Sequence, residues 1–242
     1  KTMKFLYEVE QLKKKTLEEK EVFFTEILKS KAYFTVKEAV VNQLKSEKFE
    51  GKKALLQLAL ETKNIQVRQA VAASLSKIPL EFRVQYESLL DDNSYQTREI
   101  ALYYLWANFP EFRIDYLDKS KDWIGFNDFN LKTLWLSLAI STPNYAADKE
   151  KLINELVLYS SPDYEAITRQ NALEKLVSFK LIDDVFLKNL VNATTHHMWQ
   201  FSKYGRDTIR TLLKNKEWRT SFERILPDLN EKEQFQLNRL LN

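Results

Sequence analysis

The stretch from Val67 to Pro79 constrains the fold of this chain more than any other. It reads V-R-Q-A-V-A-A-S-L-S-K-I-P, and its apolar residues at 67, 71, 75 and 78 recur at helical spacing. Residues spaced in this way lie on one face of an α-helix. The small residues Ala70 and Ala72 leave room for a neighbouring helix to approach. The stretch therefore predicts a packed helix over 64–78 that ends before Pro79.

The same arrangement of a basic residue followed by apolar residues recurs along the chain. Its basic residues are Lys37, Arg68, Arg98, Lys132, Arg169 and Arg206, which are 31, 30, 34, 37 and 37 positions apart. A period of roughly 20–50 residues is typical of repeat proteins, in which each unit buries its apolar face against the next. The pattern predicts an all-α fold, a solenoid of helical hairpins with about six units. We interpret Arg68 as a structural residue between layers and Asn64 as its nearby polar partner.

Local signals predict where individual helices begin. Capping boxes are expected at Thr16 with Glu19, at Thr35 with Glu38 and at Asn230 with Glu233, and the pair Ser161-Pro162 predicts the start of a helix over 163–179. Further helices are expected at 2–14, 49–62, 80–91, 94–109, 131–141, 148–160, 183–193, 198–215 and 216–225, with the longest irregular connection at 119–130. Because a solenoid counts as one unit, the pattern predicts a single domain over 1–242. The chain begins with Lys1 rather than Met and opens directly on a helical apolar stripe, so we expect it to be the C-terminal piece of a longer protein.

Composition excludes several classes of chemistry. The chain has no cysteine and only three glycines, so it offers neither a thiolate nucleophile nor a glycine-rich phosphate loop. Its two histidines, His196 and His197, are adjacent and therefore point in different directions on a helix. Paired carboxylates at 91–92 and 183–184 are expected to cap helix ends. No apolar run is long enough for a membrane span, which predicts a soluble protein, cytoplasmic or periplasmic.

Two groups of residues are candidates for contact with a substrate or partner. Trp199, Lys203, Arg206 and Arg210 can share one helical face, and arginine can grip a carboxylate with two hydrogen bonds. The alternative is that Trp199 and Phe201 are core residues and Arg206 pairs between layers. The second group is Tyr103 and Tyr104, near Trp106, for which core packing is the competing interpretation.

The repeats resemble HEAT and armadillo hairpins, and the chain as a whole resembles the C-terminal helical domain of zinc aminopeptidases of the aminopeptidase N family. The resemblance rests on the segments V-R-Q-A-V-A-A-S-L, T-R-E-I-A-L-Y-Y-L-W, T-R-Q-N-A-L-E-K-L and V-N-A-T-T-H-H-M-W-Q-F. It implies a non-catalytic lid over an upstream catalytic domain that holds the zinc, with no cofactor in this chain. The implied partners are that catalytic domain and a peptide substrate, whose carboxylate end we assign to Arg210.

Two other functions stay open. One is a free-standing HEAT scaffold that binds a protein partner. The other is a HEAT-fold alkylpurine DNA glycosylase. Such enzymes use tryptophans and an Asp in a basic groove, and this set is loosely imitated by Trp106, Trp123, Trp135 and Asp128. The formal net charge of +3 argues against nucleic acid as a partner, since phosphate contacts dominate DNA affinity.

Overall fold

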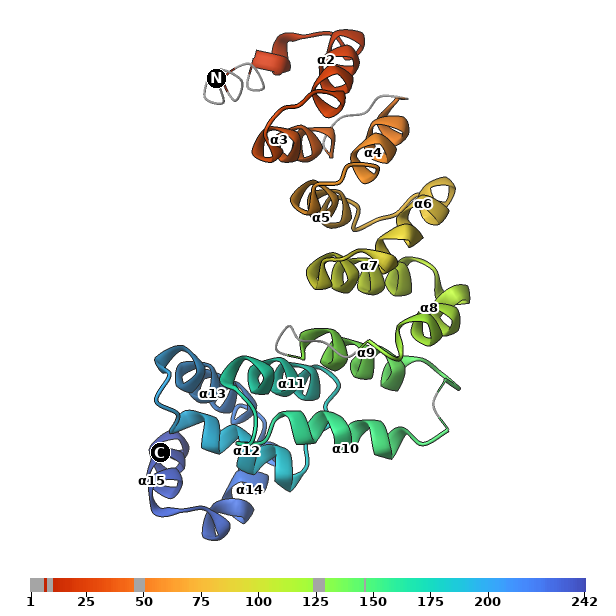
Figure 1. Cartoon of the computed structure of the whole chain (residues 1–242). Helices are drawn as coiled ribbons and strands as arrows, with labels where there is room; N and C mark the ends of the chain where they lie inside the picture. The colour runs from red at the N-terminus through yellow and green to blue at the C-terminus, as the bar shows by residue number, and fades with distance from the viewer. Residues whose placement is uncertain (1–6, 8–10, 46–50, 124–128, 146) are drawn as a thin grey trace. The chain divides into compact units, whose positions relative to one another are not determined.

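The computed structural model describes residues 7, 11–45, 51–123, 129–145 and 147–242, and every regular element among them is a helix (Figure 1). The prediction of an all-α fold is confirmed for these residues. The chain divides into two compact units, residues 1–120 and residues 121–242, which are described separately. No helix of the described residues is both long and apolar enough to cross a membrane.

The first unit is built from short helices joined by tight turns. Its α-helices are α2 (Leu17–Lys29), α3 (Phe34–Leu44), α4 (Lys52–Leu60), α5 (Ile65–Ser74), α6 (Arg83–Glu87), α7 (Tyr95–Asn108) and α8 (Arg113–Ser120). The described residues of this unit also form four 3₁₀ turns: η1 (Leu12–Lys14), η2 (Leu80–Phe82), η3 (Ser88–Asp91) and η4 (Pro110–Phe112).

Alternate helices of this unit stack on one another. Helix α3 packs on α5 and α5 packs on α7, while α2 packs on α4 in a second row (Figure 1). The buried face of α5 carries Val67, Val71 and Ala72, so the apolar stripe found in the sequence does face the core. Tyr86 of α6 is fully buried, and its hydroxyl donates to the Ala72 carbonyl at 2.8 Å. This bond ties α6 to α5.

The second unit contains the remaining helices. They are α9 (Asn130–Ser141), α10 (Lys149–Tyr159), α11 (Ala166–Ser178), α12 (Asp184–Thr194), α13 (Trp199–Leu212), α14 (Lys216–Ile225), the turn η5 (Leu226–Asp228) and α15 (Glu231–Leu241). Helix α11 packs on α9, α10 and α13. Helix α12 contacts α13, α14 and α15 and so forms the centre of the C-terminal half.

The recurring basic residue has a shared structural role. In five of the six copies its side chain donates to a backbone carbonyl at or near the end of the preceding helix or turn. The last carbonyls of a helix have no hydrogen-bond donor within the helix itself, so they need an outside donor of this kind. The pairs are Lys37 with Leu28, Arg68 with Thr62, Arg98 with Asp92, Arg169 with Ser160 and Arg206 with Thr194. The sixth, Lys132, pairs with Glu155 instead.

Arg68 is structural, as predicted, but its partner is not Asn64. The Asn64 side chain caps α5 by accepting from the Val67 amide at 3.1 Å. Arg68 Nε instead contacts Asp92 Oδ2 at 2.5 Å. The expected interlayer pair therefore forms with Asp92, which follows η3 and precedes the N-cap of α7.

Two of the three predicted capping boxes are present. Thr16 with Glu19 starts α2, and Asn230 with Glu233 starts α15, each with both reciprocal bonds. The box at Thr35 is wrong: α3 begins at Phe34, and Thr35 lies inside its first turn. Of the predicted helix 2–14, residues 2–6 and 8–10 lie outside the described residues, as do residues 124–128 of the predicted irregular connection.

Two predicted proline boundaries are also wrong. Helix α5 ends at Ser74, five residues before Pro79. Helix α11 begins at Ala166 after Glu165, and the Ser161-Pro162 pair forms a separate turn closed by the Tyr164 amide and the Ser161 carbonyl. The segment predicted as one helix over 80–91 is broken into η2, α6 and η3.

Candidate functional site

The candidate site lies on α13 and α15, and a close helix contact positions it. Helix α13 crosses the C-terminal end of α12 at Gly205. A Cβ atom built at Gly205 would lie 3.1 Å from the Thr194 amide nitrogen and 3.2 Å from the Ala193 Cβ. Only a residue without a side chain allows this approach without displacement. The contact fixes Arg206, the next residue, above the last turn of α12.

Three arginines line a hollow of ≈ 280 Å³ between α13 and α15. Arg206 and Arg210 lie one turn apart on α13, and Arg239 approaches from α15. Gln236 and Leu240 of α15 complete the lining. Helices α13 and α15 are in contact, and Leu237 of α15 is fully buried. The hollow is thus a fixed feature of the packing of the two helices.

The three guanidinium groups differ in the partners they have. Arg210 Nη1 lies 2.9 Å from Asp207 Oδ1, so it already has an ion-pair partner. Arg206 is half-buried and donates to the Thr194 carbonyl at 3.4 Å, whereas Arg239 lies over the ring of Phe235 at 5.7 Å. Within the described residues, no carboxylate pairs with Arg206 or Arg239.

The predicted strip on α13 is divided by Asp207. Lys203 Nζ lies 2.5 Å from Asp207 Oδ2, on the other side of the carboxylate from Arg210. The hydrogen bond from Lys203, with a further one from Arg210, lowers the pKa of Asp207, so the carboxylate stays ionised. Lys203 lines a different hollow, beside Val177 of α11. The structure therefore brings Arg206 and Arg210 together and separates Lys203 from them.

Two of the aromatic candidates, Trp199 and Tyr103, are too exposed to be core residues. Trp199 is 66% exposed at the start of α13, whereas Phe201 is buried under the guanidinium group of Arg169. The core interpretation is therefore right for Phe201 and wrong for Trp199. In the first unit, Tyr103 is 48% exposed and Tyr104 half-buried, with ring centroids 5.8 Å apart. Tyr103 is not a core residue either.

The residues weighed for metal or DNA chemistry occupy other environments. His196 and His197 stack with centroids 4.2 Å apart, and the described residues contain no group of three or more His, Cys, Asp or Glu placed to hold a metal. Trp135 is buried and packs on Tyr145, so it is not available to stack on a base. Asp128 lies outside the described residues.

The sequence reasoning missed Arg239 and Gln236. Both lie in the last helix, where the i, i+3 spacing places them on one face. That face could have been found from the spacing, but its position opposite Arg206 depends on how α15 packs on α12 and α13. The ion pair between Asp207 and Arg210 could have been predicted from the sequence, because the two residues are three positions apart on a predicted helix.

No protein-family model matches the chain, and no curated protein matches it either.

Proposed function

We propose that this chain is a HEAT-like helical-repeat domain that acts by binding, and that the hollow between α13 and α15 takes a carboxylate group of a peptide. The observation that carries the proposal is the convergence of Arg206 and Arg239 on one hollow, with no carboxylate partner among the described residues. Arginine binds a carboxylate through two parallel hydrogen bonds, and an anion in a recess needs such a charged partner.

The HEAT-like part of the proposal is supported by two regularities. Second helices of successive hairpins stack in the order α3, α5, α7. In four helices the basic residue that bonds a preceding carbonyl is the fourth residue of its helix: Lys37, Arg68, Arg98 and Arg169. A contact that recurs at the same helical position is expected of tandem structural repeats.

A more specific proposal is the lid role beside a zinc aminopeptidase, which the sequence resemblance supports. In that setting the bound carboxylate is the C-terminus of a peptide substrate, and the zinc belongs to a separate catalytic domain. The assignment moves from Arg210 to Arg206 and Arg239, because Arg210 already pairs with Asp207. The lid role requires a His-Glu-x-x-His segment encoded upstream of Lys1, and its absence from the gene would leave the free-standing scaffold.

The binding proposal is tested with two short peptides that differ in one group. We expect acetyl-Ala-Ala-Leu with a free carboxylate to shift the arginine side-chain signals in NMR spectra, and its C-terminal amide to leave them unchanged. The affinity should be weak, with a Kd of about 1 mM or higher, since each ion pair near the surface contributes less than about 1 kcal/mol. Arg206→Gln and Arg239→Gln should each abolish the shift.

Arg224→Gln is the matched control. Arg224 pairs with Asp184 at the surface and lies outside the hollow, so this variant should bind the free peptide as the original chain does. Equal shifts with the free and amidated peptides contradict the proposal. Saturable binding of inorganic phosphate in preference to the peptide would also contradict it, and would reassign the hollow to a phosphate group.

A further inference from the structure

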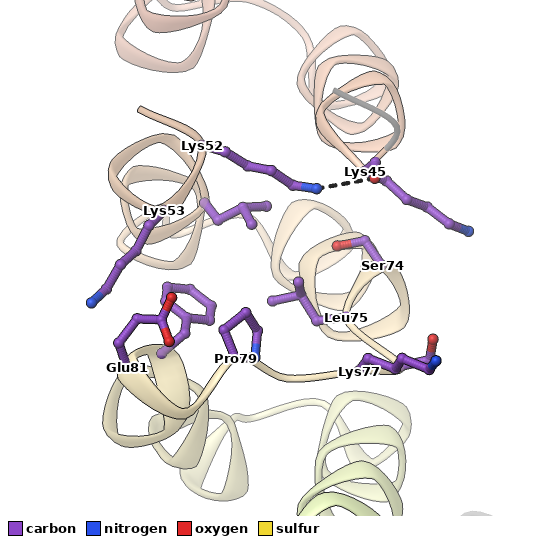
Figure 2. Close-up of a pocket in the computed structure, with 11 residues that line it drawn as sticks. Lys45, Lys52, Lys53, Ser74, Leu75, Lys77, Pro79 and Glu81 are labelled. Carbon is purple, nitrogen blue, oxygen red and sulfur yellow. Dashed lines mark hydrogen bonds between the residues drawn. The ribbon is translucent and has the colours of Figure 1, made fainter. Parts of the chain in front are cut away.

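The first unit carries a larger hollow, of ≈ 460 Å³, which is unrelated to the arginine site. It lies between α4, the end of α5 and the turn η2 (Figure 2). Its lining combines lysines with apolar side chains: Lys45, Lys52, Lys53, Leu56, Ser74, Leu75, Ser76, Lys77, Pro79, Glu81 and Phe82. The volume falls within the range of roughly 300–1,000 Å³ that is typical of ligand pockets.

The early end of α5 creates this hollow. From Leu75 the backbone leaves the helix and runs to Pro79 without regular structure. Asn108 of α7 holds the segment on its far side, because its amide nitrogen donates to the Ser76 carbonyl at 3.0 Å and its oxygen accepts from the Ile78 amide at 3.1 Å. One wall of the hollow is therefore fixed by tertiary hydrogen bonds.

The floor of the hollow is apolar. Leu56, Leu75 and Phe82 contribute to it, and each is at most 7% exposed in the folded chain. Pro79 adds an exposed ring beside them (Figure 2). An apolar surface at the bottom of a recess favours an apolar group from a ligand, because that group leaves water when it packs there.

The rim of the hollow is strongly basic. Four of its residues are lysines and, among the described lining residues, only Glu81 is acidic. Lys52 reaches across the hollow and donates to the Lys45 carbonyl at 3.0 Å (Figure 2). Within the described part of the chain, no carboxylate forms an ion pair with Lys53 or Lys77.

The lysine amino groups do not meet at one point. In Figure 2, Lys53 extends on the same side as Glu81, whereas Lys45 and Lys77 extend on the opposite side. A compact anion such as phosphate needs donors that converge on it, whereas separated cations suit several carboxylates along a chain. Together with the apolar floor, this arrangement favours an extended acidic ligand with an apolar side chain.

We propose that this hollow binds an acidic segment of a partner protein, which places one large apolar side chain on the floor and its carboxylates on the lysine rim. The first probe is the peptide Glu-Asp-Leu-Phe-Asp-Glu-amide, labelled with fluorescein at its N-terminal amine and followed by fluorescence anisotropy with the full chain. We expect saturable binding that weakens as salt is raised from 50 to 300 mM, because rim charges are screened (about 10 Å Debye length at 0.1 M).

A second peptide and two paired variants make the test specific. With Leu-Phe replaced by Ala-Ala, the peptide keeps its charge and should bind about tenfold more weakly, because it loses the apolar contact with the floor. Lys53→Glu with Lys77→Glu should weaken the first peptide by at least about tenfold through charge repulsion. Lys31→Glu with Lys63→Glu makes the same change of charge at exposed residues of this unit outside the hollow and should leave binding unchanged.

Each alternative outcome overturns the proposal. Equal weakening by the two double variants means attraction to the net charge of the chain alone. Equal binding of the two peptides excludes a role for the apolar floor, and competition by millimolar inorganic phosphate indicates a compact anion site. Absence of measurable binding of the first peptide to the original chain removes the proposal altogether. All four substitutions replace exposed side chains, so unchanged thermal melting confirms that the variants are folded.

Discussion

Arg68 and Asp92 form an ion pair that joins α5 to the residues before α7, with Nε and Oδ2 2.5 Å apart. The carboxylate of Asp92 is 2% exposed, and its other oxygen accepts from the Ser94 amide at 2.8 Å. Arg68 also donates to the Thr62 carbonyl at 2.7 Å. One guanidinium group thus satisfies acceptors from two successive hairpins.

Replacing Arg68 should destabilise the first unit. In Arg68→Ala the buried carboxylate of Asp92 loses its charged partner, and the Thr62 carbonyl loses a donor. We expect the free energy of unfolding to fall by about 2–3 kcal/mol, measured by urea denaturation.

A double-mutant cycle with Asp92→Asn measures the interaction energy between Arg68 and Asp92 separately from their other contacts. Because the amide carries no charge, Arg68→Ala should cost clearly less in the Asp92→Asn background, and the coupling energy should exceed about 1 kcal/mol. Additive losses would mean that Arg68 stabilises the chain through Thr62 alone.

Helix starts were predictable where the two capping residues bond to each other. Thr16 with Glu19 and Asn230 with Glu233 each exchange two bonds within four residues, so the local sequence contains the whole motif. Thr35 has the same spacing to Glu38, but Tyr33 precedes the first helical residue and α3 starts without a side-chain cap. A matching pattern alone does not place the boundary.

The end of α5 was not predictable, because its cause lies 30 residues away. The Asn108 side chain accepts a hydrogen bond from the Ile78 amide and donates one to the Ser76 carbonyl. These two bonds keep residues 75–78 out of the helix that their apolar spacing favours. The candidate sites follow the same rule. Arg206 and Arg210 were identified as a pair from their helical spacing, whereas Arg239 joins them only through the packing of α15.

Gly205 should resist substitution although it lies within a helix. Alanine normally stabilises a helix interior by about 1 kcal/mol relative to glycine. In Gly205→Ala the new methyl group meets the backbone of α12 at 3.1–3.3 Å, so we expect a net loss of about 1–2 kcal/mol in thermal or urea unfolding.

Gln200→Ala provides the reference for α13, since Gln200 is exposed in the same helix. This variant should change the stability by less than about 0.5 kcal/mol. If Gly205→Ala raised the stability instead, the close approach of α13 to α12 would be disproved.

Arg169 should contribute more to stability than a surface arginine. It is 2% exposed and donates to the Ser160 carbonyl at 3.2 Å and to Asn192 Oδ1 at 2.8 Å. Arg169→Met keeps most of the volume and leaves these buried acceptors without a donor, so we expect a loss of about 3 kcal/mol. Arg224→Met, which removes an exposed ion pair with Asp184, should cost less than about 1 kcal/mol, and equal losses would contradict the structural role of Arg169.

The last prediction concerns pH and rests on the turn between α12 and α13. His196 Nδ1 accepts from the Met198 amide at 3.1 Å, a bond that requires the neutral ring. Burial lowers the pKa of His196, the nearby charges of His197 and Arg169 lower it further, and Glu165 opposes the shift. Because the folded pKa lies below that of the unfolded chain, the unfolded state takes up the proton first as the pH falls. The contribution of His196 to stability is therefore complete above the ordinary histidine pKa of about 6.5 and is lost as the pH falls from there toward the folded pKa.

Urea unfolding at pH 7.5 and pH 5.5 measures this effect. In His196→Asn the side-chain oxygen can still accept from the Met198 amide but does not titrate, so this variant should lose less stability between the two pH values than the original chain does. His197→Asn is the matched control: it keeps His196 and removes only the neighbouring ring, so most of the pH dependence should remain. If His196→Asn and the original chain lose the same stability, carboxylates elsewhere in the chain account for the dependence, and the bond to Met198 has no part in it.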